Sequence, residues 1–455
     1  MQKIDLLNGR ITPTLARLAF PIMGTSLMQM AYNMIDMIWI GRVSADAVAA
    51  VGAAGMYLWL AQGLATIPRL GAQVKVAHAI GAGDAPLAAR YAQTAFHMGA
   101  VLMAFFTAVC LIFHVPLIAF FKLNSAAVTQ DAQLYLIVVA SGFLFTFCTQ
   151  IFTGLFTAIG NSTIVFRSTA VGLVANTILD PLMIFGFGPF PRMNVAGAAL
   201  ATVLAQAVVS VMFLLSAMRE SHLFPCVRLF SRSHWQDWCA VAKIGLPVSL
   251  QSMFFSSLSM IIARLIAGWG DAAIAAQKVG TQIESISYMT ADGFATAVNA
   301  FLAQNYGANK PERIRKGYWA AIRLMIVWSI FTTFILIVFP EPLCRIFISE
   351  PDVVEIGVSY LRIMGYSQIL MCLEITSSGA FQGLGHPVPP AISGIAGNLL
   401  RIPMAVVLSA TVLGLDGVWW SISISSILKG IVVFGWFIFT LQRYLARSRQ
   451  MQREE

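Results

Sequence analysis

The sequence predicts an all-α integral membrane protein, and three observations lead to this fold class. Of the 455 residues, 58% are hydrophobic and only 11% are charged, and the mean hydropathy is +0.77. A typical soluble domain carries about 25% charged residues, so this chain has too little polar surface to cover a water-exposed globule. The third observation is a series of continuously apolar runs near or above the roughly 20 residues that cross a bilayer as a helix.

Twelve such runs follow one another, and each predicts one transmembrane helix. A transmembrane barrel is excluded because its strands alternate polar and apolar residues over about ten positions. The first run is interrupted by Pro21 and is longer than the apolar core of a signal peptide, so we expect it to be retained. The predicted spans are residues 15–40, 48–80, 89–113, 131–158, 163–188, 195–217, 240–267, 272–305, 317–339, 356–382, 388–413 and 417–441.

The distribution of basic residues predicts the orientation of these spans. Lysine and arginine collect at the N-terminus, after the sixth and eighth spans, and in the C-terminal tail, all on one side of a twelve-span protein. The positive-inside rule therefore places both termini in the cytoplasm, as in a bacterial-type inner membrane. The net charge of +9 is explained by this asymmetry and by anionic lipid headgroups, and no nucleic-acid partner is expected.

An internal repeat divides the chain into two halves. Pro21 and Gly81 are 60 residues apart, and so are Pro247 and Gly307. Asn176 with Pro181 similarly matches a later Asn and Pro, at positions 398 and 403. Six spans separate equivalent positions, so the halves have the same orientation and are predicted to be related by an axis along the membrane normal. The predicted parts are an N-terminal six-helix lobe (1–218), a cytoplasmic linker (219–239) and a C-terminal six-helix lobe with a basic tail (240–455).

Polar residues in the first half suggest a site for a proton or a cation. Tyr32 and Asp36 are four residues apart on one helix face, Asn176 and Asp180 repeat that spacing, and Thr202 adds a hydroxyl. A charged side chain at bilayer depth costs roughly 2.5–3.5 kcal/mol on insertion scales and is a functional-site hypothesis by default. These oxygens suit protons or a hard cation such as sodium, whose ligands would be Asp36, Asp180, Asn176 and Thr202. The alternative is that both acids are hydrogen-bonded across helices only to stabilise the bundle.

Further residues are candidates for a hinge and for a substrate cavity. Pro21 removes a backbone hydrogen bond and is a candidate hinge in the first span, although a static kink is the alternative. The second half has Ile262 where Asp36 would repeat, so coupling chemistry is expected mainly in the first half. Adaptable methionines suit a site that accepts many apolar shapes. The candidate cavity residues are Met28, Met34, Lys278, Gln282, Glu284 and Glu374.

The sequence resembles the multidrug and toxic compound extrusion (MATE) transporters over nearly its whole length. The resemblance is carried by Pro21, by Asp36 with Gly41-Arg42 five residues later, by the motifs at 81–84, 176–181 and 197–202, and by their counterparts in the second half. It implies two six-helix lobes and export of cationic or amphipathic compounds by antiport with protons or, alternatively, sodium. It also assigns the coupling role to Tyr32, Asp36, Asn176, Asp180 and Thr202, with no cofactor and a monomeric state expected.

One branch of that family carries acids on the seventh and tenth helices, where this chain has Phe255 and Met371. The resemblance therefore favours the DinF-like branch and proton coupling. Two architecturally related alternatives stay open: a flippase for lipid-linked oligosaccharides and a dedicated exporter of one metabolite or toxin. An intramembrane aspartyl protease is the alternative enzyme, but its motif would fall at Gly81–Asp84, which the Gly-rich sequence predicts to be a turn. The chain is therefore not expected to be an enzyme.

Overall fold

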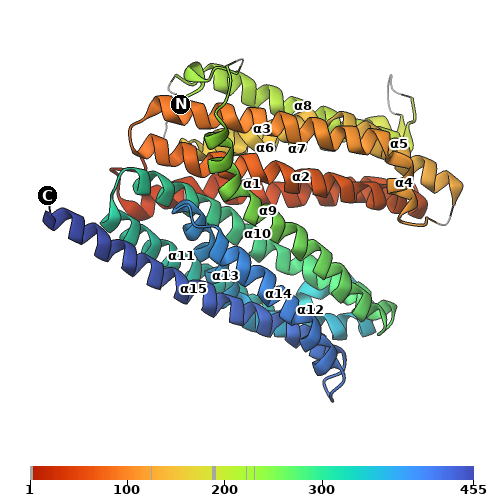
Figure 1. Ribbon diagram of the computed structural model, residues 1–455. Helices are drawn as coiled ribbons and strands as arrows, with labels where there is room; N and C mark the ends of the chain where they lie inside the picture. The colour runs from red at the N-terminus through yellow and green to blue at the C-terminus, as the bar shows by residue number, and fades with distance from the viewer. Residues whose placement is uncertain (1–3, 124, 187–190, 222, 230, 455) are drawn as a thin grey trace. The chain divides into compact units, whose positions relative to one another are not determined.

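The computed structural model describes residues 4–123, 125–186, 191–221, 223–229 and 231–454, and Figure 1 labels most of their helices. The predicted span 163–188 thus reaches two positions, 187 and 188, outside the described residues. No strand occurs in the described ranges. The helices are α1 (Ile11–Gly41), α2 (Ala45–Gly81), α3 (Ala85–Ile112), α4 (His114–Ala119), α5 (Ala126–Ser141), α6 (Phe143–Ala158), α7 (Ser162–Phe185), α8 (Asn194–Met218), the short 3-10 helix η1 (Phe224–Cys226), α9 (Trp235–Ala267), α10 (Asp271–Gly307), α11 (Pro311–Val338), α12 (Pro340–Arg345), α13 (Pro351–Gly383), α14 (Val388–Ser409) and α15 (Leu415–Glu454).

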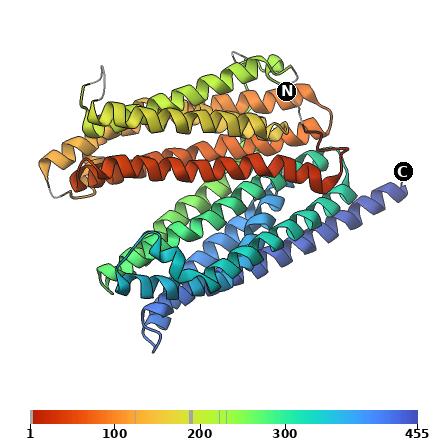
Figure 2. The same cartoon turned by 180° about the vertical axis from the view of Figure 1, so that it is seen from behind.

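Length and apolar composition identify the membrane spans among these helices. Nine helices of the described residues pass both criteria, and the bent pair of α5 and α6 makes a tenth span. The helices α1 and α10 coincide with the remaining two predicted spans, with 31 and 37 residues. The prediction of an all-α membrane protein is confirmed. The last helix, α15, has 40 residues, and its C-terminal end projects beyond the neighbouring helices in both views (Figures 1 and 2).

The fourth predicted span is two helices rather than one. Helix α5 ends at Ser141, α6 begins at Phe143, and the two are bent by 49°. Gly142 at the break lies against α8, since a Cβ added there would be 2.5 Å from a methyl carbon of Val203. The corresponding segment in the second half, α13, runs unbroken for 33 residues.

Helix bounds repeat with one offset through the first part of each half. The helices α2, α3 and α4 have 37, 28 and 6 residues, as do α10, α11 and α12. Each of the three begins and ends 226 positions before its counterpart, the same offset that separates Pro21 from Pro247. The helix bounds therefore show the repeat that the sequence motifs indicate.

The turns between these helices repeat as well. Gly83 (φ 77°) and Asn309 (φ 50°) are both left-handed, a conformation that Gly and Asn adopt more readily than other residues. After each, a backbone amide closes the turn: Asp84 N–H donates to Ala79 O (2.9 Å), and the amide of residue 310 donates in the same way. Asp84 is exposed and its carboxylate accepts the Leu87 amide at 2.9 Å. It caps α3, as expected for a turn residue.

The chain forms two compact units whose limits differ from the residue bounds expected from the sequence. Among the described residues, the first unit contains Ile4 together with Gly24–Ser249, and the second contains Asp5–Met23 together with residues 250–454. The change of unit in α1 falls two residues after Pro21, and the change in α9 falls two residues after Pro247. The first segment of each of these helices thus belongs to the unit formed mainly by the other half of the sequence.

In the first unit, α3 binds the first turn of α9 and the segment that precedes it. Arg90 donates to both carboxylate oxygens of Asp237, at 2.9 and 3.1 Å. Gln93 Nε2 donates to Ser231 O at 2.7 Å, and the His97 ring contacts Leu229 O at 2.6 Å. The end of the predicted linker is therefore part of the first unit.

In the second unit, the α10–α11 turn binds the segment that precedes α1. Lys310 Nζ donates to Leu7 O at 3.0 Å, and Arg313 Nε donates to Leu6 O at 3.1 Å. Asn305 Nδ2 donates to the same Leu6 carbonyl at 3.2 Å, and the Leu6 side chain is buried. Each unit thus binds the segment that precedes the first helix of the opposite half of the sequence.

Candidate functional site

The predicted polar residues of α7 and α8 come together because these helices pack closely. A Cβ added to Gly172 would be 2.2 Å from Val209 Cγ2, so the two helices approach to within the space of a methyl group. Asn176 and Asp180 are fully buried on α7, and Thr202 on α8 is 5% exposed. Asn176 Nδ2 donates to Asp180 Oδ1 at 3.1 Å. The spacing of four residues therefore does place both side chains on one face.

Helix α1 supplies the other two predicted residues. Asp36 interacts with Asp180 and Asn176, and Tyr32 lies close to Thr202 and to both acids. Close packing of α1 on α7 supports this position, since a Cβ at Gly24 would be 2.6 Å from the Phe166 ring. The structure thus brings all five predicted coupling residues into one site within the first unit.

The oxygen atoms of this site have capacity for a further partner. Five buried oxygens have no hydrogen-bond partner among the described residues: Tyr32 Oη, Asp36 Oδ1, Asn176 Oδ1, Asp180 Oδ2 and Thr202 Oγ1. No Lys, Arg or His of the described chain forms an ion pair with either acid. Buried polar groups are normally satisfied, and two adjacent carboxylates without a basic partner require a neutralising charge. A proton shared by the acids or a hard cation coordinated by the oxygens would supply it.

Tyr135 on α5 also belongs to this site, although it was not among the predicted site residues. Its side chain on α5 is 2% exposed, and it lies close to Asp36, Asp180 and Thr202. A tyrosine near the start of a predicted apolar span was the available signal, because its hydroxyl needs a partner when buried. Composition alone does not distinguish it from the chain's nine other tyrosines.

The remaining predicted residues are distributed over both units. Met28 and Met34 are half-buried on α1 in the first unit, whereas Pro21 lies in the part of α1 that belongs to the second. On α10, Lys278 is exposed and Gln282 is half-buried. Glu284 and Glu374 belong to a separate charge network inside the second unit. Their roles in a substrate cavity stay predictions.

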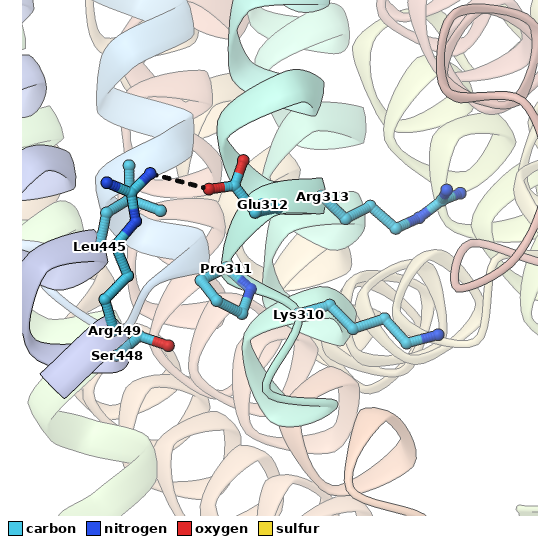
Figure 3. Close-up of a pocket in the computed structure, with 7 residues that line it drawn as sticks. All are labelled: Lys310, Pro311, Glu312, Arg313, Leu445, Ser448 and Arg449. Atoms are coloured by element: carbon cyan, nitrogen blue, oxygen red, sulfur yellow. Dashed lines mark hydrogen bonds and ion pairs between the residues drawn. The ribbon is translucent and has the colours of Figure 1, made fainter. Parts of the chain in front are cut away.

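A surface pocket in the second unit contains none of the predicted site residues. It measures about 370 Å³ and lies where α11 begins, beside α15. Figure 3 shows Arg449 directed to Glu312 while Lys310 and Arg313 extend to the opposite side, where they bind the N-terminal segment. Its basic side chains are therefore already occupied. No cluster of three or more His, Cys, Asp or Glu residues suited to a metal occurs in the described ranges.

Comparison with known proteins identifies the family. The sequence profile named MatE matches residues 21–182 and 247–407, one stretch in each half of the chain. The chain belongs to the MatE family. The two matched stretches begin at Pro21 and Pro247, the paired prolines that mark the repeat.

Relatives and solved structures of this MatE chain extend over nearly its full length. A probable multidrug resistance protein NorM of Thermotoga maritima is 30% identical over 90% of this chain and 88% of the relative. An FAD transporter of Shewanella oneidensis is 24% identical, covering 94% of this chain and 95% of the relative. A structure described as the outward-facing conformation of a multidrug resistance MATE family transporter matches with a TM-score of 0.91 and 22% identity, covering 98% and 99% of the two chains. The MatE chain is accordingly a multi-pass membrane transporter.

Proposed function

We propose that this MatE chain exports cationic or amphipathic organic compounds in exchange for protons, or alternatively sodium. The observation that carries the proposal is the acid pair of Asp36 and Asp180, in which Asp36 Oδ1 and Asp180 Oδ2 are buried without a hydrogen-bond partner and no basic residue of the described chain forms an ion pair with either acid. A transporter needs such a group because binding of the coupling ion and binding of a cationic substrate compete for the same negative charge. The name of the Thermotoga maritima relative, a multidrug resistance protein, supports the substrate class.

The proposal includes alternating access between two lobes, with both termini in the cytoplasm of a bacterial-type inner membrane. Paired helices with Pro21 and Pro247 next to the points where the chain changes unit support this mode of motion, since proline weakens the helical hydrogen-bond ladder. The basic residues of the N-terminus, the linker and the tail support the orientation. No catalytic activity is included in the proposal.

A liposome experiment tests this function. Purified protein in liposomes is supplied with a fluorescent cationic dye and an imposed proton or sodium gradient, with wild type and Asp36→Asn compared at equal incorporation. Movement under one gradient that is lost in Asp36→Asn is the expected result, and the effective gradient identifies the ion. Full export by a well-incorporated Asp36→Asn protein would contradict the role of the acid.

A second candidate function follows from the FAD transporter of Shewanella oneidensis among the relatives. Export of a dedicated metabolite would use the same architecture, so the liposome experiment includes FAD as an alternative cargo. A flippase for lipid-linked oligosaccharides is the remaining alternative, and it requires a cationic site for phosphates. The acids of the first unit favour cations instead. Absence of movement for the dye and for FAD under both gradients would favour the flippase.

A further inference from the structure

The second unit contains a buried charge network that the proposed coupling site does not use. Glu284 on α10, Glu374 on α13, Arg401 on α14 and Lys429 on α15 all lie well inside their helices, and Arg401 interacts electrostatically with both acids. Charged residues within membrane spans are costly and are retained where they bind or conduct something. The partners of each charge indicate which of them is available to a ligand.

Two of the four charges pair with each other, and a third accepts two hydrogen bonds from neutral groups. Lys429 Nζ lies 3.5 Å from Glu374 Oε1, and the two side chains are 11% and 10% exposed. Gly397 permits this position of Lys429, because a Cβ there would be 2.3 Å from its Cγ. The carboxylate of Glu284 accepts hydrogen bonds from Tyr360 Oη at 3.0 Å and from Gln368 Nε2 at 3.3 Å. Both acids are thereby satisfied.

Arg401 is different, because its guanidinium contacts only two hydroxyl groups and has donors left over. Nε donates to Ser425 Oγ at 3.0 Å, and Nη2 donates to Ser426 Oγ at 3.5 Å. No carboxylate oxygen of the described residues lies within 4 Å of it. A guanidinium offers five donors in a fork that fits a carboxylate or phosphate, and a partly buried cation that contacts no anion directly is destabilised by its loss of water. The side chain retains exposed surface, so a ligand can reach it.

We propose that Arg401, held in place by the hydroxyls of Ser425 and Ser426, binds an acidic group of the transported compound. The substrate class is then an amphipathic organic compound that carries a carboxylate or phosphate beside its cationic or aromatic body. The position of Arg401 near the middle of α14 places it far from the level of lipid headgroups if that helix spans the bilayer. This inference rests on the proposed export function and names its substrate more closely.

A pair of dyes that differ in one acidic group tests the inference. Rhodamine 19 has a free carboxylate, and rhodamine 6G is its ethyl ester with the same ring system. Their affinities for the purified full-length protein in neutral detergent are measured by fluorescence anisotropy for wild type, Arg401→Gln and Arg401→Lys. The matched control is Arg323→Gln, an exposed arginine on α11 of the same unit. Binding is measured without a gradient, so it does not depend on transport.

We expect Arg401→Gln to weaken rhodamine 19 binding by about tenfold or more, as loss of a charge-assisted hydrogen bond implies, and to leave rhodamine 6G within about twofold. Arg401→Lys should retain most of the preference for the acid, and Arg323→Gln should behave as wild type. An equal effect on both dyes, or none on either, would overturn the inference. Displacement of rhodamine 19 by phosphatidylglycerol would also overturn it, because it would show that Arg401 binds a lipid headgroup. Arg401-dependent binding in a protein that fails to export would contradict the proposed function alone.

Discussion

Arg90 and Asp237 form a two-point ion pair across 147 positions of sequence, with distances of 2.9 and 3.1 Å. The Asp237 side chain is 7% exposed, whereas that of Arg90 is 48% exposed. The pair connects α3 to the beginning of α9, so the first helix of the second half starts inside the first unit. Removing one member leaves the other charge without its partner, which costs more than an exposed pair contributes.

We therefore expect Asp237→Asn to lower the free energy of unfolding by about 1–2 kcal/mol, in the range of hydrogen bonds to charged groups. Unfolding of the detergent-solubilised protein by SDS titration measures the change. The control is Arg345→Gln, because the Arg345–Glu341 pair is exposed at both members, 56% and 57%, and should change stability by less than about 0.5 kcal/mol. Equal effects of the two variants would show that burial of the Asp237 carboxylate does not increase the contribution of its ion pair to stability.

Asp36 and Asp180 should behave as one functional unit. Each single change to Asn is expected to reduce gradient-driven export by about tenfold or more. The double variant should export no more slowly than the less active single variant, because the effects of substitutions at contacting residues do not add. Export rates in liposomes at equal incorporation provide the measurement. Asp84→Asn, an exposed helix cap on α3, is the control and should retain export. Multiplicative losses in the double variant would mean that the acids act independently.

Close contact between α2 and α9 in the first unit depends on two glycines. A Cβ at Gly71 would be 2.3 Å from Val241 O, and one at Gly245 would be 2.1 Å from Ile67 O. Each Gly→Ala change forces the helices apart and should destabilise the protein by about 1–3 kcal/mol, as overpacking does. The matched control is Gly55→Ala on α2, where nothing lies within 4 Å of an added Cβ. It should be neutral or stabilise by up to about 1 kcal/mol, in the same SDS titration.

Asp5 should make attachment of the N-terminal segment pH-dependent. Burial acts to raise the pKa of Asp5, but hydrogen bonds from Leu7 and Asn8 and the charge of Arg313 outweigh it and hold the pKa below its ordinary value of 3.8. Since the folded pKa is depressed, the stabilising contribution is complete above pH 3.8 and is lost as the pH falls through the lower folded value.

Hydrogen exchange of the Leu7 and Asn8 amides, which donate to Asp5 at 2.8 and 3.1 Å, measures this attachment. Protection factors corrected for intrinsic rates should fall across that acidic range in wild type. In Asp5→Asn they should be low and independent of pH. A wild-type pH profile that Asp5→Asn reproduces would assign the titration to another group.

Much of this architecture is predictable because its signals are local. Apolar runs give the spans, and equal spacings from Pro21 to Gly81 and from Pro247 to Gly307 give the repeat that the helix bounds show. The polar residues of the first half were also predictable, because Asp36 and Asp180 stand out in apolar surroundings. Tyr135 was not, since a tyrosine is common in a span and only packing shows which acids it meets. The break at Gly142 likewise depends on a contact with Val203 on another helix.

The membrane-spanning helices, their order and their repeat therefore follow from the amino-acid sequence, because hydropathy and helical periodicity are properties of short stretches of chain. Three-dimensional packing alone decided that Asp5–Met23 belongs with the second unit and the start of α9 with the first. It also decided that Lys429 pairs with Glu374 while Arg401 meets only serines. These outcomes depend on distances between residues far apart in the chain, and no local pattern specifies which buried charge finds a partner.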